Sequence, residues 1–203
     1  MERKLYSRKS LKVSLTVIAC VGFVLAVAAA IYIALPSIRA RRLFERQDSI
    51  QIGKSTFSDV QLIPSQIQTE PIHSCSPAEC EWLFGVANFA VPDWWRGWGV
   101  AFTVRIHVKD GQVDRKDITY WIGEGSTISA VSVTEKQDWP VNPKDLRSVK
   151  TEGTQGQHLI VYIRMTPSDP ADVRKQYTSF NWNCLWKYQG CKDEHELMPT
   201  GDW

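Results

Sequence analysis

The sequence is poor in the residues and motifs that usually carry catalysis. Of its 203 residues, 4 are histidine and 5 are cysteine. No pair of histidines has the H-E-x-x-H spacing that places two zinc ligands on one helix face. The run Gly-Glu-Gly-Ser at residues 123–126 does not match the G-x-S-x-G turn of a serine nucleophile. We therefore predict no catalytic, metal-binding or cofactor-binding residues, and no cofactor.

The individual polar residues also form no recognisable site. The histidines are scattered along the chain, and we expect each on the surface; they are His73, His107, His158 and His195. Asp114 and Asp117 lie close together in the sequence, and we expect both carboxylates to be solvated. These residues leave open whether the protein is an enzyme.

A complete nucleotide-binding motif is absent as well. Residues 53–56 (Gly-Lys-Ser-Thr) match only the end of the P-loop pattern G-x-x-x-x-G-K-S/T, and Asp48 occupies the position of its first glycine. The preceding segment is charged, whereas a P-loop follows a buried strand. Thr56 and Asp59 instead form a variant capping box, which predicts a short helix. Its apolar face is expected to contain Phe57, Val60 and Ile63.

The chain has little net charge, and its positive charge is concentrated near the N-terminus. The total is +2, but residues 1–46 carry nine Lys/Arg and two Glu, a net charge of +7 that leaves about −5 for residues 47–203. An acidic domain without a stripe of Lys/Arg is a poor nucleic-acid binder, because phosphate contacts supply most of that affinity. We expect the basic clusters to lie on lipid headgroups.

One long hydrophobic run stands out. Residues 13–35 contain no charged residue and are bracketed by Lys12 and Pro36. At about 1.5 Å per residue, a helix of this length crosses a hydrocarbon core of about 30 Å. We therefore predict a cytoplasmic tail at 1–12, a single transmembrane helix at 13–35 and a juxtamembrane spacer at 36–50. The lipid bilayer is an expected partner.

Two alternatives to an uncleaved anchor remain open. A cleaved signal peptide has an apolar region of roughly 7 to 15 residues and then a cut site between small residues. This run is longer and is followed by a basic cluster. Residues 17–20 (Val-Ile-Ala-Cys) also resemble a bacterial lipobox, in which Cys20 would be lipidated, although the apolar run continues beyond that cysteine.

The side of the membrane is predicted from the cysteines. Basic residues flank both ends of the apolar run, so the positive-inside rule gives only a slight lead. Cys75, Cys80, Cys184 and Cys191 form two close pairs, the pattern expected of disulfides in an oxidising compartment. We therefore predict an extracytoplasmic domain, either periplasmic or extracellular. A zinc site in a cytoplasmic domain is the alternative, but its usual C-x2-4-C spacing fits only the first pair.

The pairing of these cysteines is predicted to be local. A long-range bond would stabilise the fold more in the chain-entropy model, but short loops close more readily. Residues seven apart on a continuous helix are about 10 Å apart, beyond the roughly 7 Å limit for a disulfide. A Cys184–Cys191 bond therefore needs a break, which Gly190 is expected to supply. Residues 76–79 (Ser-Pro-Ala-Glu) are expected to form a single turn inside the other pair.

The clearest local structure is a β-hairpin. Apolar and polar residues alternate over 100–108, Asp110-Gly111 supplies a turn, and a second alternating strand ends at Ile122. The apolar phase of the second strand slips by one residue, which predicts a β-bulge between Asp114 and Asp117. With this bulge, the facing pairs are Val104 with Ile118, Phe102 with Tyr120, and Val100 with Ile122.

The remaining segments complete an α+β fold. We predict further strands at 82–89, 127–134 and 158–165, and a helix that begins near Ser168 and runs to about Phe180. Residues 51–203 suit one domain with a hydrophobic core. The expected architecture is an N-terminal transmembrane helix followed by a small antiparallel sheet with flanking helices.

A short segment resembles a known family, which implies a cellular location but no activity. Residues 52–60 (Ile-Gly-Lys-Ser-Thr-Phe-Ser-Asp-Val) resemble the opening helix of small bacterial envelope lipoproteins of the SmpA/OmlA type. The wider layout is similar to uncharacterised bacterial single-pass envelope proteins with a Gly-Lys-Ser-Thr opener and two cysteine pairs. The resemblance to the lipoproteins covers about nine residues. By analogy, it implies a place in the cell envelope.

Tryptophan is unusually common, with 9 in the chain. Trp94, Trp95 and Trp98 lie in one turn-rich loop and form a possible recognition surface, since flat aromatic area can stack on a sugar, enter a lipid interface or dock a partner. Ordinary packing of the loop over the sheet is the alternative. We predict a membrane-anchored domain that binds or scaffolds an envelope protein or glycan. The alternative is an envelope hydrolase or redox enzyme whose active site matches no motif.

Overall fold

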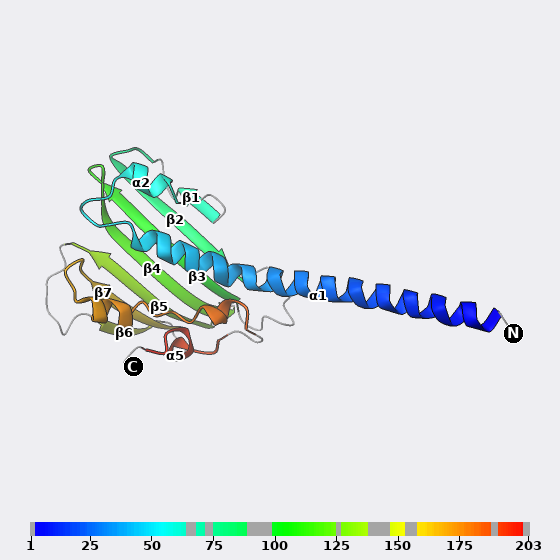
Figure 1. The fold of residues 1–203 in the computed structure, drawn as a ribbon. Coiled ribbons are helices and arrows are strands. Elements are labelled where there is room, and N and C mark those ends of the chain that lie inside the picture. The colour runs from blue at the N-terminus through cyan, green and yellow to red at the C-terminus, as the bar shows by residue number, and fades with distance from the viewer. Residues whose placement is uncertain are drawn as a thin grey trace. The chain divides into compact units, whose positions relative to one another are not determined.

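The computed structural model in Figure 1 describes most of the chain. The described residues are 3–63, 68–71, 75–88, 99–124, 127–137, 147–152, 158–187 and 191–200. The chain divides into two compact units, Met1–Leu35 and Pro36–Trp203. The first unit is helical throughout its described part, and the second contains the sheet.

The first unit belongs to helix α1, which extends over Arg3–Asp48. The side chains of residues 13–32 are exposed and uncharged. Among the described residues, α1 is the one helix that is long and apolar enough to cross a membrane. The apolar run identified in the sequence therefore forms a continuous helix, as a membrane anchor requires.

The second unit is built on a sheet of seven strands in the order β1-β2-β3-β4-β5-β7-β6. The strands are β1 (Gln68–Pro71), β2 (Glu79–Ala87), β3 (Gly99–Lys109), β4 (Gln112–Glu124), β5 (Thr127–Lys136), β6 (Arg147–Glu152) and β7 (His158–Met165). The predicted α+β class is confirmed. The sheet differs from the expected one because β7 pairs parallel with β5, while all other neighbours are antiparallel. The reason is that β6, which was not predicted, lies between β5 and β7 in the sequence and at the outer edge of β7 in the sheet. The chain therefore reverses direction twice after β5, and β7 runs parallel to it.

The predicted hairpin and its bulge are confirmed. Asp110 and Gly111 have φ values of 52° and 80°, as a type I′ turn requires. His107 pairs with Arg115 and Val108 with Val113, so Asp114 is the extra residue of the bulge. Three facing pairs occur as predicted: Val104 with Ile118, Phe102 with Tyr120, and Val100 with Ile122.

Residues 36–50 are part of the domain core, and not the spacer that we expected. Ala40, Leu43, Gln47 and Ile50 are buried against the sheet. The first three recur at the three- and four-residue spacing of one helix face. The basic residues between them are exposed on the other faces of α1, and their charge concealed this buried stripe in the sequence.

Five aromatic rings join α1 to the sheet and to the C-terminal part of the chain. The residues are Phe44, Phe102, Tyr120, Phe180 and Trp182. Their ring centroids lie 4.9 to 6.3 Å apart, mostly edge to face. The Tyr120 hydroxyl donates a hydrogen bond to the Asn181 carbonyl at 3.0 Å, and burial raises its pKa. This cluster is the centre of the core.

The other helices of the second unit are short and lie on the same side of the sheet as residues 36–48 of α1 (Figure 1). They are α2 (Phe57–Gln61), α4 (Ala171–Gln176), the 3-10 helix η2 (Trp182–Leu185) and α5 (Glu194–Leu197). Helix α4 was predicted to continue to about Phe180 but ends at Gln176. Thr178 and Ser179 donate their hydroxyls to the carbonyls of Arg174 and Lys175, which satisfies the end of the helix and turns the chain toward the core.

Both predicted local disulfides are present. Cys75–Cys80 joins the start of β2 to the residues before it, and Cys184–Cys191 joins η2 to the segment before α5. Inside the first, the Ser76 amide donates to the Glu79 carbonyl at 2.9 Å, which forms the expected turn. Gly190, the predicted break inside the second, lies outside the described residues.

Candidate functional site

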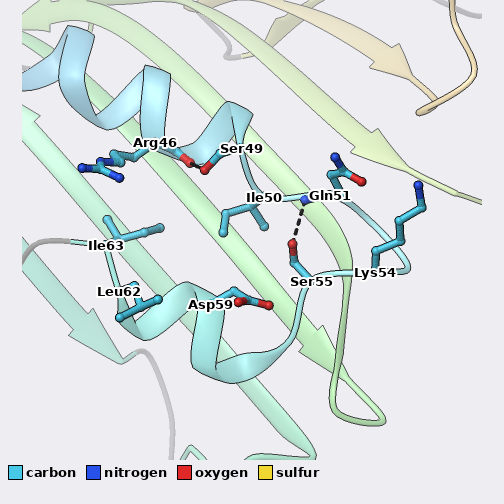
Figure 2. Close-up of a pocket in the computed structure, with 9 residues that line it drawn as sticks. All are labelled: Arg46, Ser49, Ile50, Gln51, Lys54, Ser55, Asp59, Leu62 and Ile63. Atoms are coloured by element: carbon cyan, nitrogen blue, oxygen red, sulfur yellow. Dashed lines mark hydrogen bonds between the residues drawn. The ribbon is translucent and has the colours of Figure 1, made fainter.

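A shallow depression lies between the last turn of α1, the loop that follows it and α2 (Figure 2). Its volume is about 390 Å³. It is lined by Arg46, Ser49, Ile50, Gln51, Lys54, Ser55, Asp59, Leu62 and Ile63. Buried Ile50 and Ile63 form an apolar floor, while Leu62 at the rim is 79% exposed.

The depression contains part of the Gly-Lys-Ser-Thr segment, but backbone amides of this segment already donate hydrogen bonds within the protein. The Gly53 amide donates to the Val113 carbonyl at 2.8 Å, and the Ser55 amide donates to the Gln51 carbonyl at 2.9 Å. A P-loop needs such amides free to surround a phosphate. The segment therefore attaches α1 to the β3–β4 hairpin and does not form a P-loop.

The polar side chains in the depression mostly hold the local backbone. Ser55 Oγ accepts from the Gln51 amide at 2.9 Å. Asp59 Oδ2 accepts from the Thr56 amide at 2.7 Å and from its hydroxyl at 3.0 Å, so the predicted capping interaction at the start of α2 is confirmed. These hydrogen bonds, the backbone one first, lower the pKa of Asp59. Arg46 and Lys54 lie at opposite ends in Figure 2 and do not converge on one anion.

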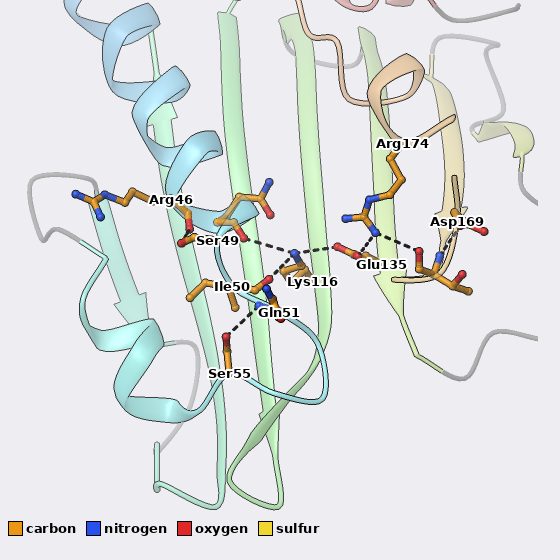
Figure 3. Close-up of polar contacts among 11 residues, drawn as sticks. Arg46, Ser49, Ile50, Gln51, Ser55, Lys116, Glu135, Asp169 and Arg174 are labelled. Atoms are coloured by element: carbon orange, nitrogen blue, oxygen red, sulfur yellow. Dashed lines mark hydrogen bonds and ion pairs between the residues drawn. The ribbon is translucent and has the colours of Figure 1, made fainter. Parts of the chain in front are cut away.

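A buried ion-pair network lies beside this region (Figure 3). Lys116 on β4 is only 2% exposed. Its ammonium is 2.9 Å from Glu135 Oε2 on β5, and it donates to the carbonyls of Ile50 at 2.8 Å and Gln47 at 3.4 Å. Glu135 Oε1 accepts from Arg174 at 2.6 Å. All three ammonium protons of Lys116 therefore have acceptors.

The network joins the end of α1 to the sheet and to α4. Gln47 lies in the last turn of α1, whose carbonyls carry the negative end of the helix dipole and favour a cation, whereas Ile50 lies just after the helix end at Asp48. Burial alone would raise the pKa of Glu135, but the charges and hydrogen bonds of Lys116 and Arg174 lower it. Its contribution to stability is therefore present above the unfolded pKa of the carboxyl and is lost as the pH falls through the lowered folded value.

Arg174 extends the network to the loop after β7. Its guanidinium also donates to the Thr166 carbonyl at 3.1 Å, and the Thr166 amide donates to Asp169 at 2.6 Å. Both carboxylate oxygens of Glu135 are engaged. The role of this network is structural, because Lys116 and Glu135 are buried and all three charged groups are already paired.

The sheet face opposite α1 offers a second candidate surface, which we call the open face. Its residues alternate with the core residues on β2, β3, β4, β5 and β7, and most are partly exposed. In contrast, the five rings of the aromatic cluster and the buried C-terminal residues Leu185, Leu197 and Met198 belong to the core on the α1 side. Thr103, Thr119, Ser132 and Tyr162 lie side by side across four strands. The hydroxyls of Thr119 and Ser132 are 3.2 Å apart.

Trp121 lies two residues beyond Thr119 on this face. It pairs directly with Ala101 on β3 and with Ala130 on β5, and the indole is partly exposed. On the other side of the hydroxyl row are charged residues. They form three acid–base pairs: Glu81 with Arg105, Asp117 with Arg115, and Asp114 with His107.

The acid–base pairs correct part of the sequence interpretation. Asp114 and Asp117 are not merely solvated, and His107 is not an isolated surface residue. As the extra residue of the bulge, Asp114 brings its side chain to His107, in keeping with the way bulges redirect side chains. Thr134 also donates to Asp117 at 2.7 Å.

The structure does not place most of the other predicted positions. Trp94, Trp95, Trp98 and His73 lie outside the described residues, as does the side chain of His158. His195 is exposed on α5. Within the described part of the chain, no group of three or more His, Cys, Asp or Glu residues could hold a metal ion.

Sequence analysis missed Trp121 and Lys116. Both depart from the alternation of β4, because Trp121 occupies the polar phase and Lys116 the apolar phase. That departure is the signal that could have identified them.

Comparison with known proteins adds no functional assignment. No protein-family model, curated protein or solved structure matches the chain. The resemblance of residues 52–60 to envelope lipoproteins therefore stays a prediction. Function has to be argued from the surfaces described above.

The ion-pair network predicts a large effect of a single substitution. Lys116→Met should lower the free energy of unfolding by about 3 to 5 kcal/mol, because buried Glu135 and two carbonyls lose their shared donor. Lys175→Met on exposed α4 is the matched control, with an expected change within about 0.5 kcal/mol. Equilibrium urea unfolding would measure both, and equal losses would contradict the structural role of Lys116.

Proposed function

We propose that this protein is anchored in a membrane by the apolar part of α1 and carries its sheet domain outside the cytoplasm. The length, composition and exposure of residues 13–32 support the anchor. The Cys75–Cys80 and Cys184–Cys191 disulfides support the oxidising side, because disulfides rarely persist in the cytosol. A domain on that side of a membrane belongs to the cell envelope.

The domain acts in this proposal by binding an envelope component on its open face. The observation that carries the proposal is the composition of that face: Trp121 stands beside a row of hydroxyls and three acid–base pairs, on the sheet face opposite the core. A partly exposed aromatic ring offers contact area at low entropic cost, and the surrounding polar groups supply directed hydrogen bonds.

A hydrolytic or redox enzyme is the alternative, and one observation favours it. The His107 imidazole is hydrogen-bonded to Asp114, the arrangement by which a carboxylate orients a general base. The depression beside α1 contains Asp59 but no histidine among its lining residues. The imidazole and the described cavity therefore do not belong to one site, which places the binding role first.

A topology measurement tests the location. A reporter that is active only outside the cytoplasm, fused after Trp203, should be active, because the disulfides require an oxidising compartment. The control fusion after Lys12, which lacks the apolar run, should be inactive. Activity of a cytoplasm-only reporter at Trp203 would contradict the proposed side and would make the disulfides a minor state.

Photocrosslinking in intact cells tests the binding surface. A photoreactive amino acid in place of Thr103, in the hydroxyl row, should form an adduct with an envelope component upon illumination. The same amino acid in place of exposed Lys175, on α4, is the control and should form none. Equal adducts at both positions, or no adduct at Thr103, would contradict recognition by the open face.

A further inference from the structure

Trp121 has the surroundings of a stacking platform. Its partners across the neighbouring strands are alanines that are only 4% and 3% exposed, so no large side chain stands beside the indole in that row. Among the described residues, none makes a ring contact or a hydrogen bond with the indole. An aromatic ring that is partly exposed and unengaged can accept a flat, weakly polar ring against its surface.

The hydroxyl row is positioned to contact the same ligand. Thr103, Thr119 and Ser132 are direct neighbours on three adjacent strands, which lie about 4.8 Å apart. Thr119 is two residues from Trp121 on the same face, at a separation of about 7 Å. A ligand that stacks on the indole and extends over this row therefore meets one hydroxyl per strand. Thr103 Oγ1 donates to the Thr119 carbonyl at 3.4 Å, and the Thr119 and Ser132 hydroxyls lie within hydrogen-bond distance of each other at 3.2 Å. Because a hydroxyl oxygen has two lone pairs, each of the three can still accept a hydrogen bond from a ligand.

Charge complementarity selects among ligands. Arg105 lies 3.1 Å from Glu81, Arg115 lies 3.0 Å from Asp117, and His107 is hydrogen-bonded to Asp114. These pairs contain as many acidic as basic groups, and Lys136 beside Arg115 and Arg164 beside Thr134 are the further basic residues on β5 and β7. Anionic polymers and lipids gain most of their affinity from uncompensated cations. Paired carboxylates and guanidinium groups still offer hydrogen bonds to a neutral ligand that carries many hydroxyls.

We propose that the open face binds a neutral glycan, with a sugar ring stacked on Trp121 and its hydroxyls bonded to Thr103, Thr119 and Ser132. This inference rests on the proposed function, because it assigns a ligand class to the same binding surface. Bonds from the acid–base pairs extend the site toward His107. Neutral glycans combine a flat apolar ring face with peripheral hydroxyls, which matches the order of groups across the open face.

Calorimetric titration of the full chain tests the proposal. The protein is held in a detergent without a sugar headgroup, and the probes are soluble oligomers of glucose and of N-acetylglucosamine. At least one probe should bind, with an affinity that changes little between low and high salt because no net charge is involved. Trp121→Ala should weaken binding about tenfold or more, and Trp121→Phe should retain most of it.

Two further variants keep the result interpretable. Trp186→Ala removes another exposed tryptophan, 42% exposed and outside the open face, and should leave affinity within about twofold. If Trp121→Ala fails to fold, Thr119→Val removes one hydroxyl at constant shape and should weaken binding while Trp121 remains.

The outcomes separate the glycan assignment from the broader function. No binding of any oligomer, unchanged binding by Trp121→Ala, or binding only to charged polymers in a salt-dependent manner would overturn the glycan assignment. If an adduct still forms at Thr103 in that case, the open face binds another envelope component and the proposed function stands. If no adduct forms either, both proposals fail.

Discussion

The buried ammonium of Lys116 is the constraint on which the arrangement of the domain depends. A charge with almost no exposure must be paired and hydrogen-bonded, or it costs several kcal/mol. Its acceptors come from the last turn of α1, from Ile50 just after that helix and from β5, which is far away in the sequence. Satisfying Lys116 therefore requires α1 to end over the middle of the sheet.

Several features follow from that position of the helix end. The loop after α1 reaches the β3–β4 hairpin, where the Gly53 amide bonds to the Val113 carbonyl. Thr56 can then begin α2, and the depression forms between the two helices. Phe44, one turn before the end of α1, is placed among the aromatic rings of the core. The same contacts concentrate the core on one face of the sheet, so that the residues of the other face remain partly exposed to solvent.

The sequence was most informative where the structure is local. The hairpin, its turn and its bulge follow from period-2 alternation and Asp110-Gly111, and the capping of α2 follows from the spacing of Thr56 and Asp59. The two disulfides join residues five and seven positions apart, which loop closure favours.

The sequence was least informative where pairing is long-range or where charge hides burial. The parallel pairing of β5 with β7 depends on β6, whose polar sequence gave no strand signal. Arginines on the exposed faces of α1 concealed its buried stripe. The burial of Lys116 could not be predicted from nearby residues, because its partners Ile50 and Glu135 are 66 and 19 positions away in the chain. Recognition of such a site needs the fold itself.

Hydrogen–deuterium exchange of the full chain tests the central claim that the end of α1 belongs to the core of the domain. Peptides that cover residues 40–48 should exchange as slowly as those from β3 and β4, because all three open in one cooperative unit when α1 is held by Lys116 and the aromatic rings. Exchange of residues 40–48 at the rate of exposed α4, while β3 and β4 remain protected, would show that α1 is attached loosely and would contradict this account.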